Sequence, residues 1–114
     1  MTRITACEVS ALADGDALKV EAPGGAIALF NVDGEFYAVD DRCSHGNASM
    51  SEGYVEDDAT VECPLHAARF CMKTGAALCQ PATDPLRTYP VEIVDGTVYI
   101  DVPGSVAKIG GSQR

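Results

Sequence analysis

Two short segments are the most informative part of this sequence: Cys43-Ser44-His45 and, beyond residues 46–62, Cys63-Pro64-Leu65-His66. Each segment offers one thiolate and one imidazole, and His45 and His66 are the only histidines of the chain. Such donors bind either zinc or an iron–sulfur cluster. Zinc fingers usually place two cysteines together and then two histidines together. The mixed pairs instead suit a two-iron cluster in which one iron takes both thiolates and the other takes both imidazoles.

Short strand-like runs lie on both sides of this stretch. Several alternate with period two and carry β-branched or aromatic residues, as half-buried strands do. Asp33-Gly34 and Asp95-Gly96 are dipeptides typical of tight hairpin turns. They predict two hairpins, 27–32 with 35–39 and 89–94 with 97–102. A short helical turn is expected near residues 10–13, with Ser10 as its N-cap.

These runs predict an all-β fold of one domain over residues 1–114. An antiparallel scaffold, similar to a sandwich or barrel, is expected over about 1–40 and 87–104. Residues 41–86 are rich in Gly, Pro, Cys and His, which indicates an inserted, loop-rich subdomain that carries the site. The Gly- and Ser-rich end, about 105–114, is expected to be a flexible tail.

Composition and charge narrow the class of function. The chain has 114 residues, of which 46% are hydrophobic, with 17 acidic against 8 basic side chains and a net charge of −9. This balance argues against nucleic acid or an anionic membrane as partner and favours a partner with a basic docking patch. The sequence has no apolar run of about 18 residues and no apolar segment near Met1, so we expect a cytoplasmic protein with reduced thiols.

The spacing Cys43-x-His45 and Cys63-x-x-His66 resembles the two ligand boxes of Rieske [2Fe–2S] proteins. The resemblance covers almost the whole chain and is strongest to the small ferredoxins of bacterial aromatic-ring-hydroxylating dioxygenase systems, of the naphthalene or biphenyl type. The further motifs that carry it are His45-Gly46-Asn47, Met50-Ser51-Glu52-Gly53, Arg69-Phe70, Thr74-Gly75, Leu78-Cys79-Gln80-Pro81-Ala82 and Tyr89-Pro90-Val91.

This resemblance implies a Rieske fold with one [2Fe–2S] cluster per chain. Its metal and cofactor ligands would be Cys43, His45, Cys63 and His66. The implied function is one-electron transfer from a flavin-dependent NADH:ferredoxin reductase to a terminal dioxygenase, by a monomer with no catalytic residues of its own. Two alternatives stay open: a Rieske small subunit bound tightly in another redox enzyme, such as a nitrite reductase, or a zinc-stabilised structural module.

The sequence also predicts details around the site. Respiratory Rieske proteins place a serine hydroxyl where this chain has Ala68, so we expect a potential toward the low end of the Rieske range of about −150 to +300 mV. Gly46, Gly53 and Gly75 are expected to supply backbone conformations that turn amides toward the sulfides. Arg69 is expected to form a salt bridge within the fold.

The remaining cysteines and aromatic residues are expected to have packing roles. The cysteines outside the two boxes are predicted to be small apolar fillers; they are Cys7, Cys71 and Cys79. The aromatic side chains near the site are predicted to pack in the core or around the cluster; they are Tyr37, Tyr54, Phe70 and Tyr89.

Overall fold

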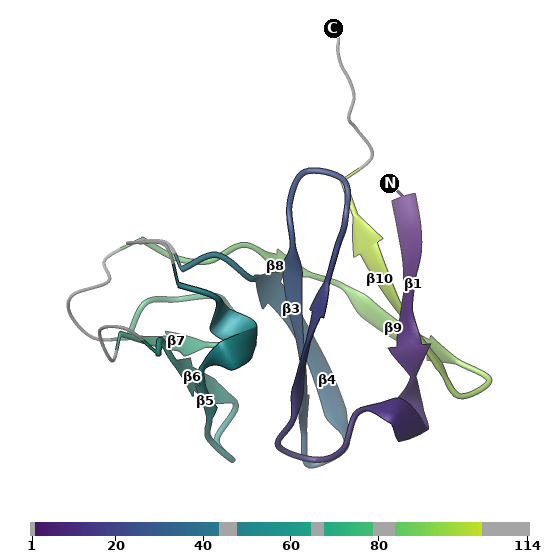
Figure 1. Cartoon of the computed structure of the whole chain (residues 1–114), viewed down its shortest axis with the longest axis horizontal. Helices are drawn as coiled ribbons and strands as arrows, with labels where there is room; N and C mark the ends of the chain where they lie inside the picture. The colour runs from purple at the N-terminus through teal and green to yellow at the C-terminus, as the bar shows by residue number, and fades with distance from the viewer. Residues whose placement is uncertain (1, 44–47, 65–67, 79–83, 104–114) are drawn as a thin grey trace, which may run out of the picture.

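A computed structural model of the chain describes residues 2–43, 48–64, 68–78 and 84–103. Within these ranges the chain forms three antiparallel sheets and two short 3-10 helices, and Figure 1 shows the smallest sheet at one end of the molecule. No helix in these ranges is long and apolar enough to cross a membrane.

Two sheets form the larger part of the molecule. One has the order β1-β10-β9 and the other the order β2-β3-β4-β8, while β5-β6-β7 make the third. The elements are β1 (Thr2–Glu8), η1 (Val9–Ala11), β2 (Ala17–Val20), β3 (Ile27–Val32), β4 (Glu35–Asp40), η2 (Met50–Glu52), β5 (Tyr54–Val55), β6 (Thr60–Glu62), β7 (Arg69–Cys71), β8 (Thr88–Tyr89), β9 (Val91–Val94) and β10 (Thr97–Val102).

The two predicted hairpins are present. Asp33 and Gly34 have φ values of 54° and 85°, and Asp95 and Gly96 have values of 51° and 79°. Positive φ at both central residues gives the turn a twist that matches the flanking strands. The second hairpin is shorter than predicted because the chain changes sheet at Pro90: β8 pairs with β4, whereas β9 pairs with β10.

Strand β3 is the centre of the molecule and is buried along its whole length. Ala28, Phe30 and Val32 belong to a core shared with the β5–β7 end, whereas Ile27 and Leu29 belong to a core shared with β10. Unlike a half-buried strand, this strand is covered on both faces. It therefore connects the two hydrophobic cores through its alternating side chains.

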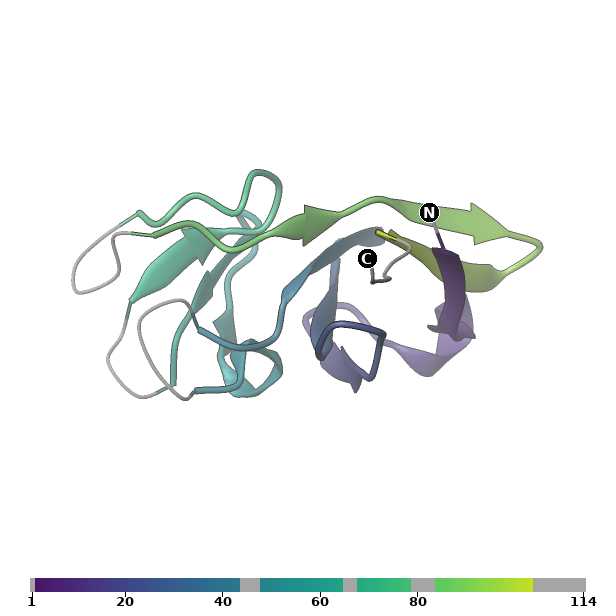
Figure 2. The same cartoon turned by 90° about the horizontal axis from the view of Figure 1, so that it is seen from above.

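Residues 41–78 contain more regular structure than a loop-rich insertion suggests. Strands β5, β6 and β7 are only two or three residues long, too short for an alternating pattern to show in the sequence. Figure 2 shows the β8–β9 segment running from this end of the molecule to the side of β1 and β10. The connection that leaves the small sheet is thus also part of the larger scaffold.

The N-terminal region differs from the prediction. Residues 2–8 form strand β1, which pairs with β10 and contains a bulge between Thr5 and Cys7. The bulge breaks the alternation that would have marked the strand. The helical turn covers Val9–Ala11, with Glu8 at the N-cap position and no side-chain cap. The prediction of Ser10 as N-cap is wrong, because Ser10 lies inside the turn.

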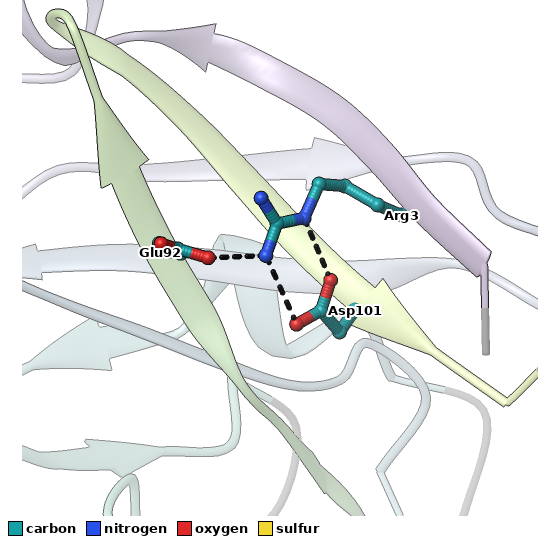
Figure 3. Close-up of polar contacts among 3 residues, drawn as sticks. All are labelled: Arg3, Glu92 and Asp101. Carbon is teal, nitrogen blue, oxygen red and sulfur yellow. Dashed lines mark hydrogen bonds and ion pairs between the residues drawn. The ribbon is translucent and has the colours of Figure 1, made fainter.

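An ion-pair cluster joins all three strands of the β1-β10-β9 sheet, which we call the outer sheet. Arg3 on β1 contacts Asp101 on β10, with Nε to Oδ1 at 3.0 Å, and also contacts Glu92 on β9 (Figure 3). The same guanidinium lies over the ring of Tyr99, 5.5 Å from its centroid. These contacts raise the pKa of Arg3 and lower that of Asp101, chiefly through the hydrogen bond between them. The first and last strands of the chain are thereby held together.

Candidate metal centre

Two loops with the same backbone construction carry the cysteines of the predicted site. The N–H of Cys43 donates to the carbonyl oxygen of Ala48 at 2.9 Å, and the N–H of Cys63 donates to that of Ala68 at 2.6 Å. An antiparallel pair of residues flanks each loop: Arg42 pairs with Ser49 around the first, and Glu62 pairs with Arg69 around the second. Each cysteine is therefore the first residue of a loop that a backbone hydrogen bond closes.

The thiols of both cysteines are buried. Cys43 is 2% exposed and Cys63 is 1% exposed, and neither forms a disulfide. Both belong to the same apolar core, which also contains Met50 and Phe70. The burial keeps water away from the sulfur atoms. Two buried cysteines at matching positions of two loops, neither in a disulfide, fit a group that needs two thiolate ligands.

The structure places two of the four predicted ligands and leaves the other two undescribed. His45 and His66 lie outside the described residues, as does Gly46. Among the residues that the structure describes, no group of three or more His, Cys, Asp or Glu side chains could hold a metal ion. The described part of the site thus consists of the two cysteines and the backbone that closes their loops.

A buried carboxylate near the first loop is a feature that the sequence analysis missed. Asp41 is 3% exposed, and its carboxylate accepts the hydroxyl of Ser49 at 2.7 Å and the N–H of Ser51 at 2.9 Å. Its own N–H donates to the carbonyl of Ala26, and its carbonyl accepts the N–H of Met50. The only sequence signal is the pair of serines after the first box, which can supply short polar donors.

The preceding residue, Asp40, holds the segment that leaves the site. Its carboxylate accepts the Tyr89 hydroxyl at 2.6 Å and the Arg87 Nε–H at 3.2 Å, and its N–H donates to the Arg87 carbonyl at 2.9 Å. The pKa of Tyr89 is raised to about 12. Burial is the largest cause, and the hydrogen bond from its hydroxyl to Asp40 is the second. The contact with Asp40 likewise raises the pKa of Arg87.

Two of the three glycines that were expected to serve the sulfides have another role. The N–H of Gly53 donates to the carbonyl of Met50 at 3.0 Å, and the N–H of Gly75 donates to that of Cys71 at 2.7 Å. A Cβ at Gly53 would collide with the carbonyl oxygen of Glu62, and one at Gly75 with that of Leu86. The N–H groups of these two glycines are therefore used within the fold, and close backbone approach accounts for glycine at both positions.

The predictions for side chains around the site have mixed outcomes. Arg69 forms the expected internal salt bridge, with its guanidinium 3.3 Å from the carboxylate of Glu62. Phe70 is fully buried, as predicted, but Tyr54 is 62% exposed, so the prediction that it packs is wrong. The alternation along β5 explains this difference, because Tyr54 faces away from the core to which Val55 contributes.

The described cysteines outside the two loops are only half-buried. Cys7 and Cys71 both carry free thiols, and Cys79 lies outside the described residues. Burial raises the pKa of Cys7. A hydrogen bond with the Thr74 side chain is the largest contribution to the lowered pKa of Cys71. Cys7 packs against the core around β10, as a filler should, whereas Cys71 has a polar environment.

Comparison with known proteins identifies the family. A model of the Rieske [2Fe-2S] domain matches residues 2–90. The chain belongs to the Rieske [2Fe-2S] domain family. Membership of this family makes the cofactor a Rieske-type [2Fe–2S] cluster, as predicted, and confirms the all-β Rieske fold.

The similar Rieske proteins are mainly dioxygenase ferredoxins. The 3-phenylpropionate/cinnamic acid dioxygenase ferredoxin subunit of Escherichia coli is 67% identical over 90% of this chain and 96% of its own. The Sphingomonas yanoikuyae B1 ferredoxin is 42% identical over 90% of this chain and all of its own, with a TM-score of 0.82. This chain is therefore a ferredoxin of the aromatic-ring dioxygenase type, an electron-transfer component and not an enzyme, as predicted.

Two further structures bear on partners. A complex of reduced oxygenase and oxidised ferredoxin in carbazole 1,9a-dioxygenase contains a chain that is 35% identical, covers 86% of this chain and 91% of its own, and has a TM-score of 0.82. A structure described as the small subunit of an NADH-dependent nitrite reductase from Mycobacterium tuberculosis is 27% identical. The match covers 87% of this chain and 93% of the other, with a TM-score of 0.78. The same Rieske fold therefore occurs in both classes of protein.

Proposed function

We propose that this ferredoxin carries single electrons from a flavin-dependent, NADH-oxidising ferredoxin reductase to a terminal aromatic-ring dioxygenase. We assign Cys43 and Cys63 as ligands of one iron, and His45 and His66 as ligands of the other. The observation that supports the assignment is the pair of buried cysteines at matching positions of two loops that are closed by equivalent backbone hydrogen bonds.

The ligand set explains why this chain suits electron transfer at moderate potential. Two ferric ions, two sulfides, two thiolates and two neutral imidazoles sum to zero charge, whereas four thiolates would give a net charge of −2. Adding an electron to a neutral centre is electrostatically easier, which raises the potential above that of all-cysteine ferredoxins. The buried core around Cys43 and Cys63 holds these ligands in place without solvent.

The proposal includes the partners and the division of the chain. The oxygenase complex of the carbazole ferredoxin supports an oxygenase partner, and the identity to the Escherichia coli protein supports a 3-phenylpropionate- or cinnamate-like aromatic acid as the substrate of the system. Residues 1–40 and 87–104 would form the scaffold and 41–86 the cluster-binding subdomain, in agreement with the position of β5–β7. We propose a cytoplasmic monomer, because a dependence on NADH requires access to the cell's reduced nicotinamide pool.

The first experiment is electron paramagnetic resonance of the dithionite-reduced protein, with iron and sulfide measured on the same sample. A rhombic signal with the low average g value of a nitrogen-ligated two-iron cluster is expected. Serine at Cys43 or Cys63 should abolish this signal, whereas the matched changes Cys7→Ser and Cys71→Ser should leave it intact. Zinc in place of iron in the wild type would contradict the proposal. A redox titration of the same sample tests the expected potential near about −150 mV.

A second candidate function is that of a tightly bound Rieske subunit, favoured by the fold of the nitrite reductase small subunit. Reconstitution separates the two candidates. A carrier should elute from gel filtration as a monomer in the presence of its oxygenase and should support turnover at substoichiometric amounts. Co-elution as a permanent complex would favour the subunit.

A further inference from the structure

The two cysteine loops have equivalent closing hydrogen bonds and flanking residue pairs, but the buried residue two positions before each cysteine differs. Superposing Cys43 on Cys63 in the sequence also matches Ala48 with Ala68, and the pair Arg42–Ser49 with the pair Glu62–Arg69. The same matching places Asp41 opposite Val61. Both side chains are buried, at 3% and 0% exposure, but only the first is a carboxylate. The two loops are therefore anchored by different chemistry.

The carboxylate of Asp41 holds the segment that follows the first loop. It accepts hydrogen bonds from the Ser49 hydroxyl and from the Ser51 N–H, both just past the loop closure at Ala48. Its own backbone is tied to Ala26, in the connection that leads into β3. The carboxylate thus connects the chain before and after the loop, and the backbone N–H of Asp41 fastens this segment to the scaffold.

Asp41 also brings a buried negative charge close to the proposed centre. Two peptide units put the Cα atoms of Asp41 and Cys43 at most about 7.6 Å apart. Among the described residues, the donors to the carboxylate are a hydroxyl and an amide, which are neutral groups. Solvent screens a buried charge weakly, so this charge opposes the addition of an electron at a nearby centre.

We propose that Asp41, which is not a ligand, is a positioning residue that holds the Cys43 loop through Ser49 and Ser51 and lowers the reduction potential of the centre. This inference rests on the proposed function, because it requires Cys43 to ligate the cluster. It predicts that changes at Asp41, before the first loop, affect the potential and retention of the cluster differently from changes at Val61, before the second loop.

The test compares three variants of the full-length protein loaded with its cluster. Asp41→Asn keeps the size of the side chain and an acceptor for the Ser51 N–H but removes the charge. Asp40→Asn makes the same charge change one residue earlier, where the carboxylate is partly exposed and paired with Arg87. Ser49→Ala keeps the charge and removes one hydrogen bond. The measurements are the midpoint potential at one pH and the rate at which visible absorbance is lost to an iron chelator.

Asp41→Asn is expected to shift the midpoint to a more positive potential, and by more than Asp40→Asn does. Ser49→Ala should leave the midpoint near that of the wild type but speed the loss of the cluster about tenfold, since a hydrogen bond to an ionised acceptor is lost. A midpoint of Asp41→Asn equal to that of the wild type, or a shift matched by Asp40→Asn, would overturn the role in potential. An unchanged rate for Ser49→Ala would overturn the positioning role.

Failure of this inference and failure of the proposed function are distinguishable. A wild type without the two-iron resonance signal contradicts the function itself, whereas a normal wild type with unresponsive variants contradicts only the role of Asp41. If Asp41→Asn assembles no cluster, the rate measured for Ser49→Ala decides the positioning role, and the midpoint of Asp41→Ser, which also removes the charge, decides the role in potential.

Discussion

Asp40 and Asp41 are neighbours in the chain, yet their side chains hold different segments. Asp40 ends β4 and binds Arg87 and Tyr89 on the segment that leaves the site, whereas Asp41 binds Ser49 and Ser51 beside the first loop. Successive side chains of an extended chain point to opposite sides, which explains this division. A pair of acidic residues thus fastens both the entry and the exit of the proposed cluster-binding region.

Tyr89 provides a residue-scale prediction about pH. Its pKa in the folded chain is about 12, raised from 10 first by burial and then by Asp40. The folded state therefore favours the neutral phenol, so this stabilisation is complete below pH 10 and is lost as the pH rises through 12. Because the side chain is only partly buried, we expect it to amount to about 1 kcal/mol.

Ultraviolet absorbance of tyrosinate measures this titration directly. Tyr89→Phe should remove the component that ionises near pH 12, and its unfolding free energy should fall less between pH 10 and 12. Tyr54→Phe, at the exposed tyrosine, controls for the loss of one phenol. Loss of a component that titrates at or below 10 in Tyr89→Phe would contradict the assignment.

Cys71 and Cys7 form a matched pair for thiol reactivity. Both are half-buried and free, but the Thr74 hydrogen bond lowers the pKa of Cys71, while burial raises that of Cys7. The thiolate is the reactive form, so iodoacetamide should label Cys71 faster at about pH 8. Mass spectrometry of the labelled peptides checks this order.

Changes at Thr74 show whether its hydroxyl is the cause. Thr74→Val should slow the labelling of Cys71, and Thr74→Ser, which keeps the hydroxyl, should not. Equal rates at Cys7 and Cys71 in the wild type would refute the expected order.

At the scale of elements, turns with similar backbone geometry have different surroundings. Gly34, between β3 and β4, has a φ of 85° and open space around its Cα, whereas Gly75, after β7, has a φ of 80° and the Leu86 carbonyl beside it. The hydrogen bond from the Leu86 N–H to the Gly75 carbonyl, 2.8 Å long, joins the same two segments. Gly75 therefore marks a contact between segments, and Gly34 marks only a turn.

Alanine at each glycine tests this difference. Gly34→Ala should lower the free energy of unfolding by about 1 kcal/mol, because only the backbone conformation is penalised. Gly75→Ala should cost about 2–4 kcal/mol, because the collision with Leu86 adds to that penalty. Chemical denaturation measures both values, and equal losses would show that the collision is relieved without cost.

At the scale of the whole molecule, two hydrophobic cores meet at β3. One core includes Cys43 and Cys63 and the other includes Val98 and Ile100, so the scaffold and the proposed centre are packed on opposite faces of one strand. The outer sheet is closed by Arg3, which joins β1, β10 and β9 (Figure 3). The two ends of the described chain are thus held in one sheet.

The Arg3 cluster predicts a salt-dependent contribution to stability. Glu92→Gln should lower the melting temperature at low ionic strength, and the difference from the wild type should shrink as salt is added, because the pair is exposed and screened. Glu56→Gln, in the exposed turn between β5 and β6, controls for the change in net charge. A deficit that persists at high salt would show that the contact is not chiefly electrostatic.

The ligand spacing and the hairpin turns could be predicted from the sequence alone, because both depend on residues close together in the chain. The spacing of Cys43, His45, Cys63 and His66 predicted the family and its cofactor, because the two proposed ligands of each loop lie close together in the sequence. Asp33-Gly34 and Asp95-Gly96 predicted both hairpins, because a two-residue turn with positive φ requires such residues. The ligand roles of all four residues stay a prediction, and both histidines lie outside the described residues.

The burial of residues, and the contacts between residues distant in sequence, became known only from the folded structure. The burial of β3 on both faces, the short strands β5–β7, the bulged strand β1 and the carboxylate of Asp41 depend on partners distant in sequence. Gly53 and Gly75 likewise owe their identity to carbonyls of Glu62 and Leu86 that approach them only in the fold. Burial and close contact are properties of the packed chain, so local patterns could not reveal them.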